Sequence, residues 1–172
     1  MLFRSVFGYY LLLENLTNEL NMNNLLKNIT GIFLLTISLF SWSNAKDQQA
    51  IDSALNTLES FMDTFNSKDM AAWSETLNYP HVRLASGKVS VWDTKEDYAA
   101  VDIFDRLEAN GWHHSAWVSR EVILVSENKV HISTVFQRYD KDNQPTKKYQ
   151  SLYIVTKENG KWGVKARSSL AP

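Results

Sequence analysis

The chain has 172 residues, 6 Gly, 3 Pro and no Cys, and its 18 basic and 19 acidic residues give a net charge of −1. This length fits one domain, and the low Gly and Pro content excludes collagen-like and low-complexity proteins. The absence of Cys excludes a disulfide scaffold, a thiolate zinc site and a cysteine nucleophile. A net charge near zero gives no reason to expect nucleic acid or an anionic membrane surface as a partner.

The first 45 residues are apolar and contain a predicted targeting segment. A short basic stretch precedes the apolar run from Ile29 to Phe40. The small residues Ser43 and Ala45 occupy the −3 and −1 positions of a signal-peptidase cleavage site after Ala45. The run is shorter than the roughly 20 residues that span a bilayer. We therefore expect residues 22–45 to be a signal peptide cleaved after Ala45, and the mature protein to be secreted or periplasmic with no membrane span.

The segment before Met22 does not fit this pattern, because a signal peptide usually begins at its basic end. We predict that residues 1–21 are an upstream extension from an over-long gene model. Residues 46–172 then form the mature domain. A chain of that length buries about two-thirds of the surface that it exposes when unfolded, which is enough for one core.

The mature chain begins with two predicted helices. Apolar side chains recur at steps of three and four between Asp47 and Phe65, which predicts an amphipathic helix. Asp69 is a suitable N-cap for a short second helix. We expect Pro80 to end that helix, because the residue before a proline disfavours the helical conformation.

A hairpin and a third helix follow. Apolar and polar residues alternate from His81 to Trp92 around a Ser86-Gly87 turn, which predicts two paired strands with His81 opposite Trp92. On that register His81, Arg83, Ser90 and Trp92 share one face. Thr94 is a predicted N-cap for the third helix, and Asn110-Gly111 is a predicted stop signal.

After Trp112, apolar residues recur at every second position, as in a β-strand. Four strands are predicted, at 114–126, 129–139, 148–157 and 161–169. Their short, turn-rich connections favour an antiparallel meander. Helices followed by a meander predict an α+β fold.

Three segments of this pattern resemble the nuclear-transport-factor-2-like superfamily, which includes SnoaL-like and ketosteroid-isomerase-like proteins. Residues 61–69 resemble the end of the first helix of that fold, residues 78–84 its first strand, and residues 159–169 its final hairpin. The resemblance implies a cone-shaped fold in which three N-terminal helices and a short hairpin pack on a curved antiparallel sheet. It also implies a homodimer formed through the sheet face.

A narrower resemblance joins the chain to an uncharacterised bacterial secreted subgroup of SnoaL-like domains. It rests on residues 79–87, 111–115 and 166–172. No reaction is assigned to that subgroup. The fold itself hosts isomerases, dehydratases, hydrolases, cyclases and non-catalytic binders, so function has to be argued from the site.

The catalytic groups of ketosteroid isomerases are missing from the positions that the resemblance assigns to them. The tyrosine donor falls at Phe61, the carboxylate base falls near Ala85, and the second acid falls near Leu152. None of these side chains carries an ionisable group, so steroid-isomerase chemistry is not expected.

His81 is the candidate general base, because it shares a hairpin face with Arg83 and Trp92 and imidazole titrates near neutral pH. The alternative is a structural histidine stacked on Trp92. His113 and His114 would point to opposite faces of a strand and could not bind one ion together. We therefore predict no metal site and no cofactor.

The remaining candidates are aromatic and cationic residues that could line the cone. Predicted ligand-binding residues are Tyr79, Arg83, Trp92, Trp117, Arg138, Tyr153 and Arg167. Aromatic walls with a few polar groups are typical of sites for small organic ligands. Two functions stay open: a domain that binds a small organic molecule, and a lyase, isomerase or hydrolase with His81 as general base.

Overall fold

The structure is a computed structural model, and it describes Asn21, residues 45–101 and residues 103–172. The chain divides into two units, Met1–Ala45 and Lys46–Pro172. The predicted upstream extension and signal peptide lie outside the described residues, apart from Asn21 and Ala45. No helix in the described part of the chain is long and apolar enough to cross a membrane.

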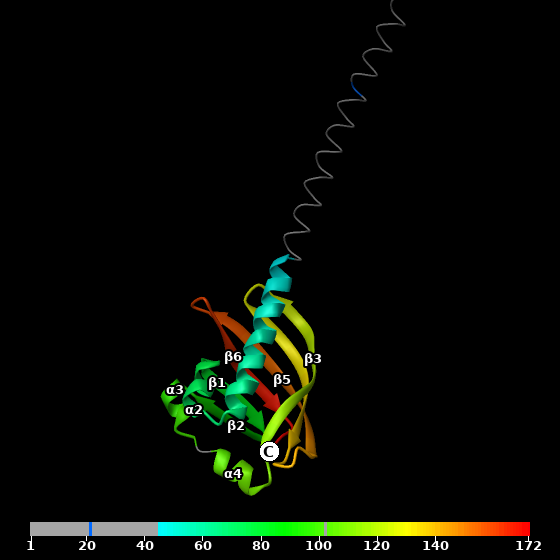
Figure 1. The fold of residues 1–172 in the computed structure, drawn as a ribbon. Helices are drawn as coiled ribbons and strands as arrows, with labels where there is room; N and C mark the ends of the chain where they lie inside the picture. Colours follow the sequence, from blue (N-terminus) through cyan, green and yellow to red (C-terminus); the bar gives the residue numbers. More distant parts are fainter. Residues whose placement is uncertain (1–20, 22–44, 102) are drawn as a thin grey trace, which may run out of the picture. The chain divides into compact units, whose positions relative to one another are not determined.

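A long N-terminal helix crosses one face of the sheet (Figure 1). It includes residues 45–66 of the described chain. Ala54, Leu58 and Phe61 are buried along one side of it, as the predicted amphipathic pattern requires. The polar residues on its other side face solvent.

Three shorter helices follow, α2 (Met70–Glu75), α3 (Lys95–Ala99) and α4 (Phe104–Ala109). Both predicted N-caps are confirmed. The backbone N–H of Ala72 donates to Asp69 Oδ1 over 2.9 Å, and that of Asp97 donates to Thr94 Oγ1 over 3.1 Å.

Two details of the predicted helices are wrong. The predicted third helix is divided into α3 and α4 by a break that includes Val101 and Ile103, whose branched side chains lower helix propensity. The second helix ends at Glu75, before Pro80, and the following strand already contains the proline.

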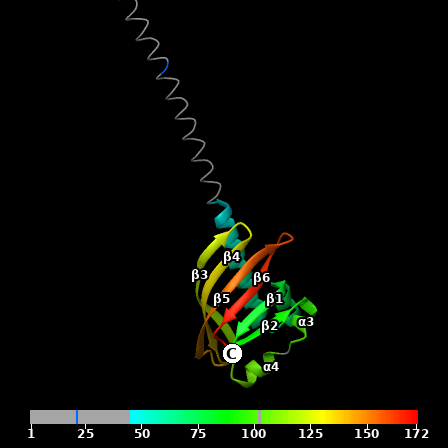
Figure 2. The same ribbon diagram turned by 180° about the vertical axis from the view of Figure 1, so that it is seen from behind.

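The six strands form one sheet in the order β2-β1-β6-β5-β4-β3. The strands are β1 (Leu77–Ala85), β2 (Lys88–Trp92), β3 (His114–Ser126), β4 (Lys129–Tyr139), β5 (Pro145–Glu158) and β6 (Lys161–Ser169). Neighbouring strands are antiparallel except β1 and β6, which are parallel. The predicted hairpin therefore extends the curved sheet at one edge (Figure 2).

The predicted strands and hairpin register are confirmed, with small differences in bounds. His81 pairs with Trp92 and Val82 pairs with Val91, as the two-residue turn requires. The α+β fold is the predicted one, with helices packed on a curved sheet. The largest completely buried side chains of the core include Leu58, Leu77 and Tyr153.

Candidate functional site

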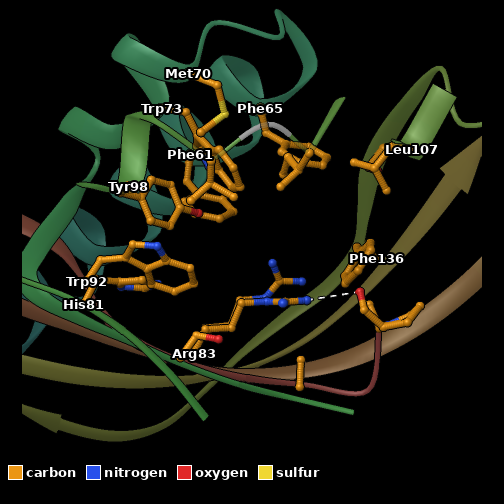
Figure 3. Close-up of a pocket in the computed structure, with 18 of the residues that line it drawn as sticks. Phe61, Phe65, Met70, Trp73, His81, Arg83, Trp92, Tyr98, Leu107 and Phe136 are labelled. Carbon is orange, nitrogen blue, oxygen red and sulfur yellow. Dashed lines mark hydrogen bonds between the residues drawn. The ribbon is translucent and has the colours of Figure 1, made fainter. Parts of the chain in front are cut away.

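A cavity of about 510 Å³ lies between the helices and the sheet. The N-terminal helix and α2 supply one wall, and residues of β1 and β2 lie across from them (Figure 3). Strands β4, β5 and β6 also line the cavity. This volume is within the usual range for sites that hold small organic molecules.

One wall of the cavity is aromatic, and we call Phe61, Phe65, Trp73 and Tyr98 the aromatic wall. Their rings contact one another at close range: the Phe65–Trp73 centroids are 4.9 Å apart and the Trp73–Tyr98 centroids 5.1 Å apart. Tilted and edge-to-face contacts of this kind stabilise the wall beyond simple burial. The aromatic wall is therefore fixed by its own packing before any ligand arrives.

His81 is part of the opposite wall but is only 2% exposed. Its ring stacks on Trp92, with centroids 5.9 Å apart and planes at 26°, and it contacts Tyr98 edge-on. Its Nδ1 lies 3.0 Å from the carbonyl oxygen of Val164, which can only accept, so Nδ1–H is the donor.

Burial lowers the pKa of His81 to about 4, although the hydrogen bond to Val164 acts in the opposite direction. The imidazole is therefore neutral at pH 7. No Asp or Glu of the described residues lines the cavity to orient it as a base. The stacked and hydrogen-bonded arrangement matches the structural alternative for His81.

Four of the five arginines in the described chain line the cavity: Arg83 on β1, Arg106 on α4, Arg138 on β4 and Arg167 on β6. Arg83 and Arg167 are register partners on the neighbouring parallel strands β1 and β6. Arg83 donates from Nη2 to the backbone oxygen of Pro172 over 3.1 Å. Arg167 donates from Nη2 to Ser169 Oγ, also over 3.1 Å.

No Asp or Glu side chain among the described residues pairs with these arginines, because none of the six ion pairs found there includes them. The oxygen that Arg83 contacts belongs to Pro172, the last residue of the sequence. The Nε atoms of Arg138 and Arg167 are buried without a hydrogen-bond acceptor in the same part of the chain. Burial lowers the pKa of Arg83, and the charge of Arg167 lowers it further. The cavity therefore concentrates positive charge.

Aromatic rings hold two of the guanidinium groups in place. The Arg167 guanidinium lies 5.1 Å from the centre of the Tyr153 ring and 5.4 Å from that of Phe136. The Arg138 guanidinium lies 4.9 Å from the centre of the Tyr149 ring. Such cation–π contacts orient a guanidinium without neutralising its charge.

Six of the eight residues proposed from the sequence line the cavity: His81, Arg83, Trp92, Arg138, Tyr153 and Arg167. Tyr79 and Trp117 lie outside it. The Tyr79 hydroxyl donates instead to the backbone oxygen of Ser74 over 2.9 Å, and burial raises its pKa to about 12. The Trp117 ring packs edge-on against Tyr153 and lies under Arg120.

Sequence reasoning missed Arg106 and Lys88 at the cavity. The sequence does indicate Lys88, because side chains two residues apart on a strand share a face, and Lys88 is two residues from Ser90 and four from Trp92. The sequence does not indicate Arg106 in the same way. In the continuous third helix that was predicted, Arg106 would lie beside the apolar stripe and not on it. The break between α3 and α4 places Arg106 on a separate helix, α4.

The adjacent histidines do not point apart as predicted. His113 Nδ1 and His114 Nδ1 are 3.1 Å apart, because β3 begins at His114 and His113 still belongs to the preceding loop. Within the described ranges, no group of three or more His, Asp or Glu side chains is placed to hold a metal ion.

The fold and its cavity define the class of protein as NTF2-like. The chain belongs to the family of NTF2-like proteins DUF6841, whose model matches residues 52–170. A search of curated protein sequences gave no match.

Solved structures share the fold at low sequence identity. An NTF2-like protein with a cystatin-like fold from Novosphingobium aromaticivorans is 13% identical over 79% of this chain and 88% of its own, with a TM-score of 0.59. A ketosteroid isomerase-like protein from Erwinia carotovora is 19% identical over 70% and 96%, with a TM-score of 0.51. The association domain of C. elegans CaMKII is 13% identical over 73% and 98%, with a TM-score of 0.54. These likenesses describe the fold alone.

Phe61 and Ala85 both line the cavity. By the family resemblance they stand where a ketosteroid isomerase has its tyrosine donor and near its carboxylate base. Neither side chain can donate or accept a proton. These two positions of the cavity therefore lack the catalytic groups.

Proposed function

We propose that this domain binds a small organic molecule in its cavity and does not transform it. The observation that carries the proposal is a preformed cavity of about 510 Å³ that joins an aromatic wall to a few polar groups. Apolar walls with a small number of oriented polar groups are the usual composition of small-molecule sites.

The packing of the aromatic wall supports binding because a rigid site loses little entropy when a ligand enters. Trp73 contacts Phe61, Phe65, Tyr98 and Phe104, so its ring is held from several sides. Its Nε1 is nevertheless buried without an acceptor in the described chain. A polar atom of a ligand within reach of this N–H would satisfy it.

The alternative is a lyase, isomerase or hydrolase with His81 as general base. Such an enzyme needs a base whose pKa lies near the pH at which the enzyme works. The lowered pKa makes the His81 imidazole a weak base. Its Nδ1–H donates to Val164, so Nε2 is the only ring nitrogen that can take up a proton. A carboxylate to assist it is not found among the described residues of the cavity. These observations favour binding over catalysis.

We also propose that two copies associate through the outer face of the sheet, in a secreted or periplasmic protein. Leu84, Val89 and Val91 are 44%, 61% and 56% exposed on β1 and β2, on the face away from the cavity. Exposed apolar side chains that cluster on a sheet are common at interfaces. The similarity to an association domain is consistent with this arrangement.

A thermal-shift screen of chemically diverse fragments tests ligand binding in the cavity. Ser90→Phe places a ring in the cavity, because Ser90 lines it, whereas Ser60→Phe adds the same ring at an exposed position of the N-terminal helix outside the cavity. We expect fragments that raise the Tm of the wild type and of Ser60→Phe but not of Ser90→Phe. Fragments that act equally on all three proteins, or a screen with no stabilising fragment, would overturn the proposal.

A further inference from the structure

We propose that the ligand is an organic acid, an apolar body that carries a carboxylate, and that the arginines of the cavity bind this carboxylate. The inference rests on the proposed binding function and names the chemical class of its ligand. It depends on the charge of the cavity, on the positions of the guanidinium groups and on the location of the aromatic wall.

The charged side chains of the cavity are all basic. Arg83, Arg106, Arg138, Arg167 and Lys88 line it, and no acidic side chain of the described residues does. Arg120, the remaining described arginine, lies elsewhere and forms an ion pair with Glu59. A cation that is taken out of water without a partner is costly, so a set of them favours a ligand that brings negative charge.

Arg83 and Arg167 lie on neighbouring strands, and Arg138 lies on β4, which β5 separates from β6. Arg83 and Arg167 are paired across β1 and β6, and Arg167 is paired with Tyr153 across β5 and β6. Each arginine has donors that its few protein hydrogen bonds do not use, including the buried Nε of Arg138 and of Arg167. Planar guanidinium groups match the two oxygens of a carboxylate and bind it with paired hydrogen bonds.

The cavity is also divided by polarity. Arg83 extends from the strands toward the centre, while Phe61, Phe65 and Trp73 lie across from it (Figure 3). Arg106 and Lys88 are exposed side chains of the same lining. A ligand with one charged end would place that end at Arg83, Arg138 and Arg167 and its apolar body against the aromatic wall.

Matched acids and amides test this inference by isothermal titration calorimetry on the purified protein. The probes are benzoate and benzamide, 2-naphthoate and 2-naphthamide, and octanoate and octanamide. Each pair has nearly the same shape and differs in charge. We expect at least one acid to bind, and to bind at least about tenfold more tightly than its amide, because charge-assisted hydrogen bonds to arginine are stronger than neutral ones.

Arginine variants assign the preference to the cavity. Arg167→Met keeps the apolar stem, and we expect it to reduce the ratio of acid to amide affinity to below about threefold. Arg120→Met is the matched control, and we expect it to keep the wild-type ratio. Circular dichroism checks the fold of each variant, and Arg83→Met replaces Arg167→Met if that variant does not fold.

The outcomes separate this inference from the proposed function. Amides that bind as tightly as their acids would overturn the acid preference and leave ligand binding intact. An acid preference that persists in Arg167→Met, or in Arg83→Met where that variant replaces it, would overturn the role of these arginines. Failure of all six probes to bind would overturn the inference, and if the fragment screen also gave no ligand, the proposed function would fall with it.

Discussion

Buried, neutral His81 makes the stability of the domain sensitive to acid. The native state holds the pKa of His81 at about 4, whereas an exposed histidine has an ordinary pKa near 6.5. Between these values the unfolded chain takes up a proton that the native state does not, so the free energy of unfolding falls as the pH falls. This contribution is complete above about pH 6.5 and is lost as the pH decreases toward 4.

The size of the effect follows from the difference between the two pKa values. Between pH 7.5 and pH 4.5, proton uptake by one such group in the unfolded chain lowers the free energy of unfolding by about 2.5 kcal/mol. Acidic residues also titrate in this range, so the wild type is compared with His81→Gln, which can still donate to the oxygen of Val164. We expect the stability advantage of the wild type over the variant to shrink by about 2.5 kcal/mol.

Urea unfolding of both proteins at the two pH values, followed by tryptophan fluorescence, measures this difference. His113→Gln is the matched control, because His113 is exposed and lies outside the cavity. A wild-type advantage that is unchanged between pH 7.5 and pH 4.5 would refute the burial of a neutral His81. So would an equal change in the His113→Gln comparison.

Further predictions concern the core, the proposed interface and the predicted cleavage site. Leu58→Ala should lower the free energy of unfolding by about 2–5 kcal/mol in urea, because Leu58 is completely buried, and a loss under about 1 kcal/mol would contradict its place in the core. Val91→Asp should shift analytical ultracentrifugation profiles from dimer to monomer, whereas a wild type that stays monomeric at high concentration would contradict the interface. Edman sequencing of secreted protein should give Lys46 as its first residue, and retention of Met1 would contradict the predicted cleavage.

The strands of this fold were predictable because their period and turns are local. Alternation from 114 onward and short polar turns place β3 to β6 within a few residues of the predicted bounds. The hairpin register followed from a two-residue turn, which fixes His81 opposite Trp92. The break between α3 and α4 was not predicted, because the apolar stripe continued through it and outweighed the β-branched residues.

The cavity was only partly predictable. The alternation of side chains along a strand tells which residues share a face of the sheet, but it does not tell which face is concave. Parity placed His81, Arg83, Ser90 and Trp92 together, and the structure places that set at the cavity. Pairing of Arg83 with Arg167 depends on the parallel contact of β1 with β6, which joins distant parts of the chain. Trp117 was expected inside because of its residue type, but its ring packs beside the cavity.

Crystallography with 4-bromobenzoate tests the central claim most directly, because the anomalous signal of bromine locates the apolar end of the ligand. We expect the carboxylate within about 3 Å of the guanidinium groups of Arg83 or Arg167, as charge-assisted hydrogen bonds require. We expect the bromine against Phe65 and Trp73. A ligand bound in the reverse orientation, or bound only outside the cavity, would contradict the assignment of this domain as a receptor for organic acids.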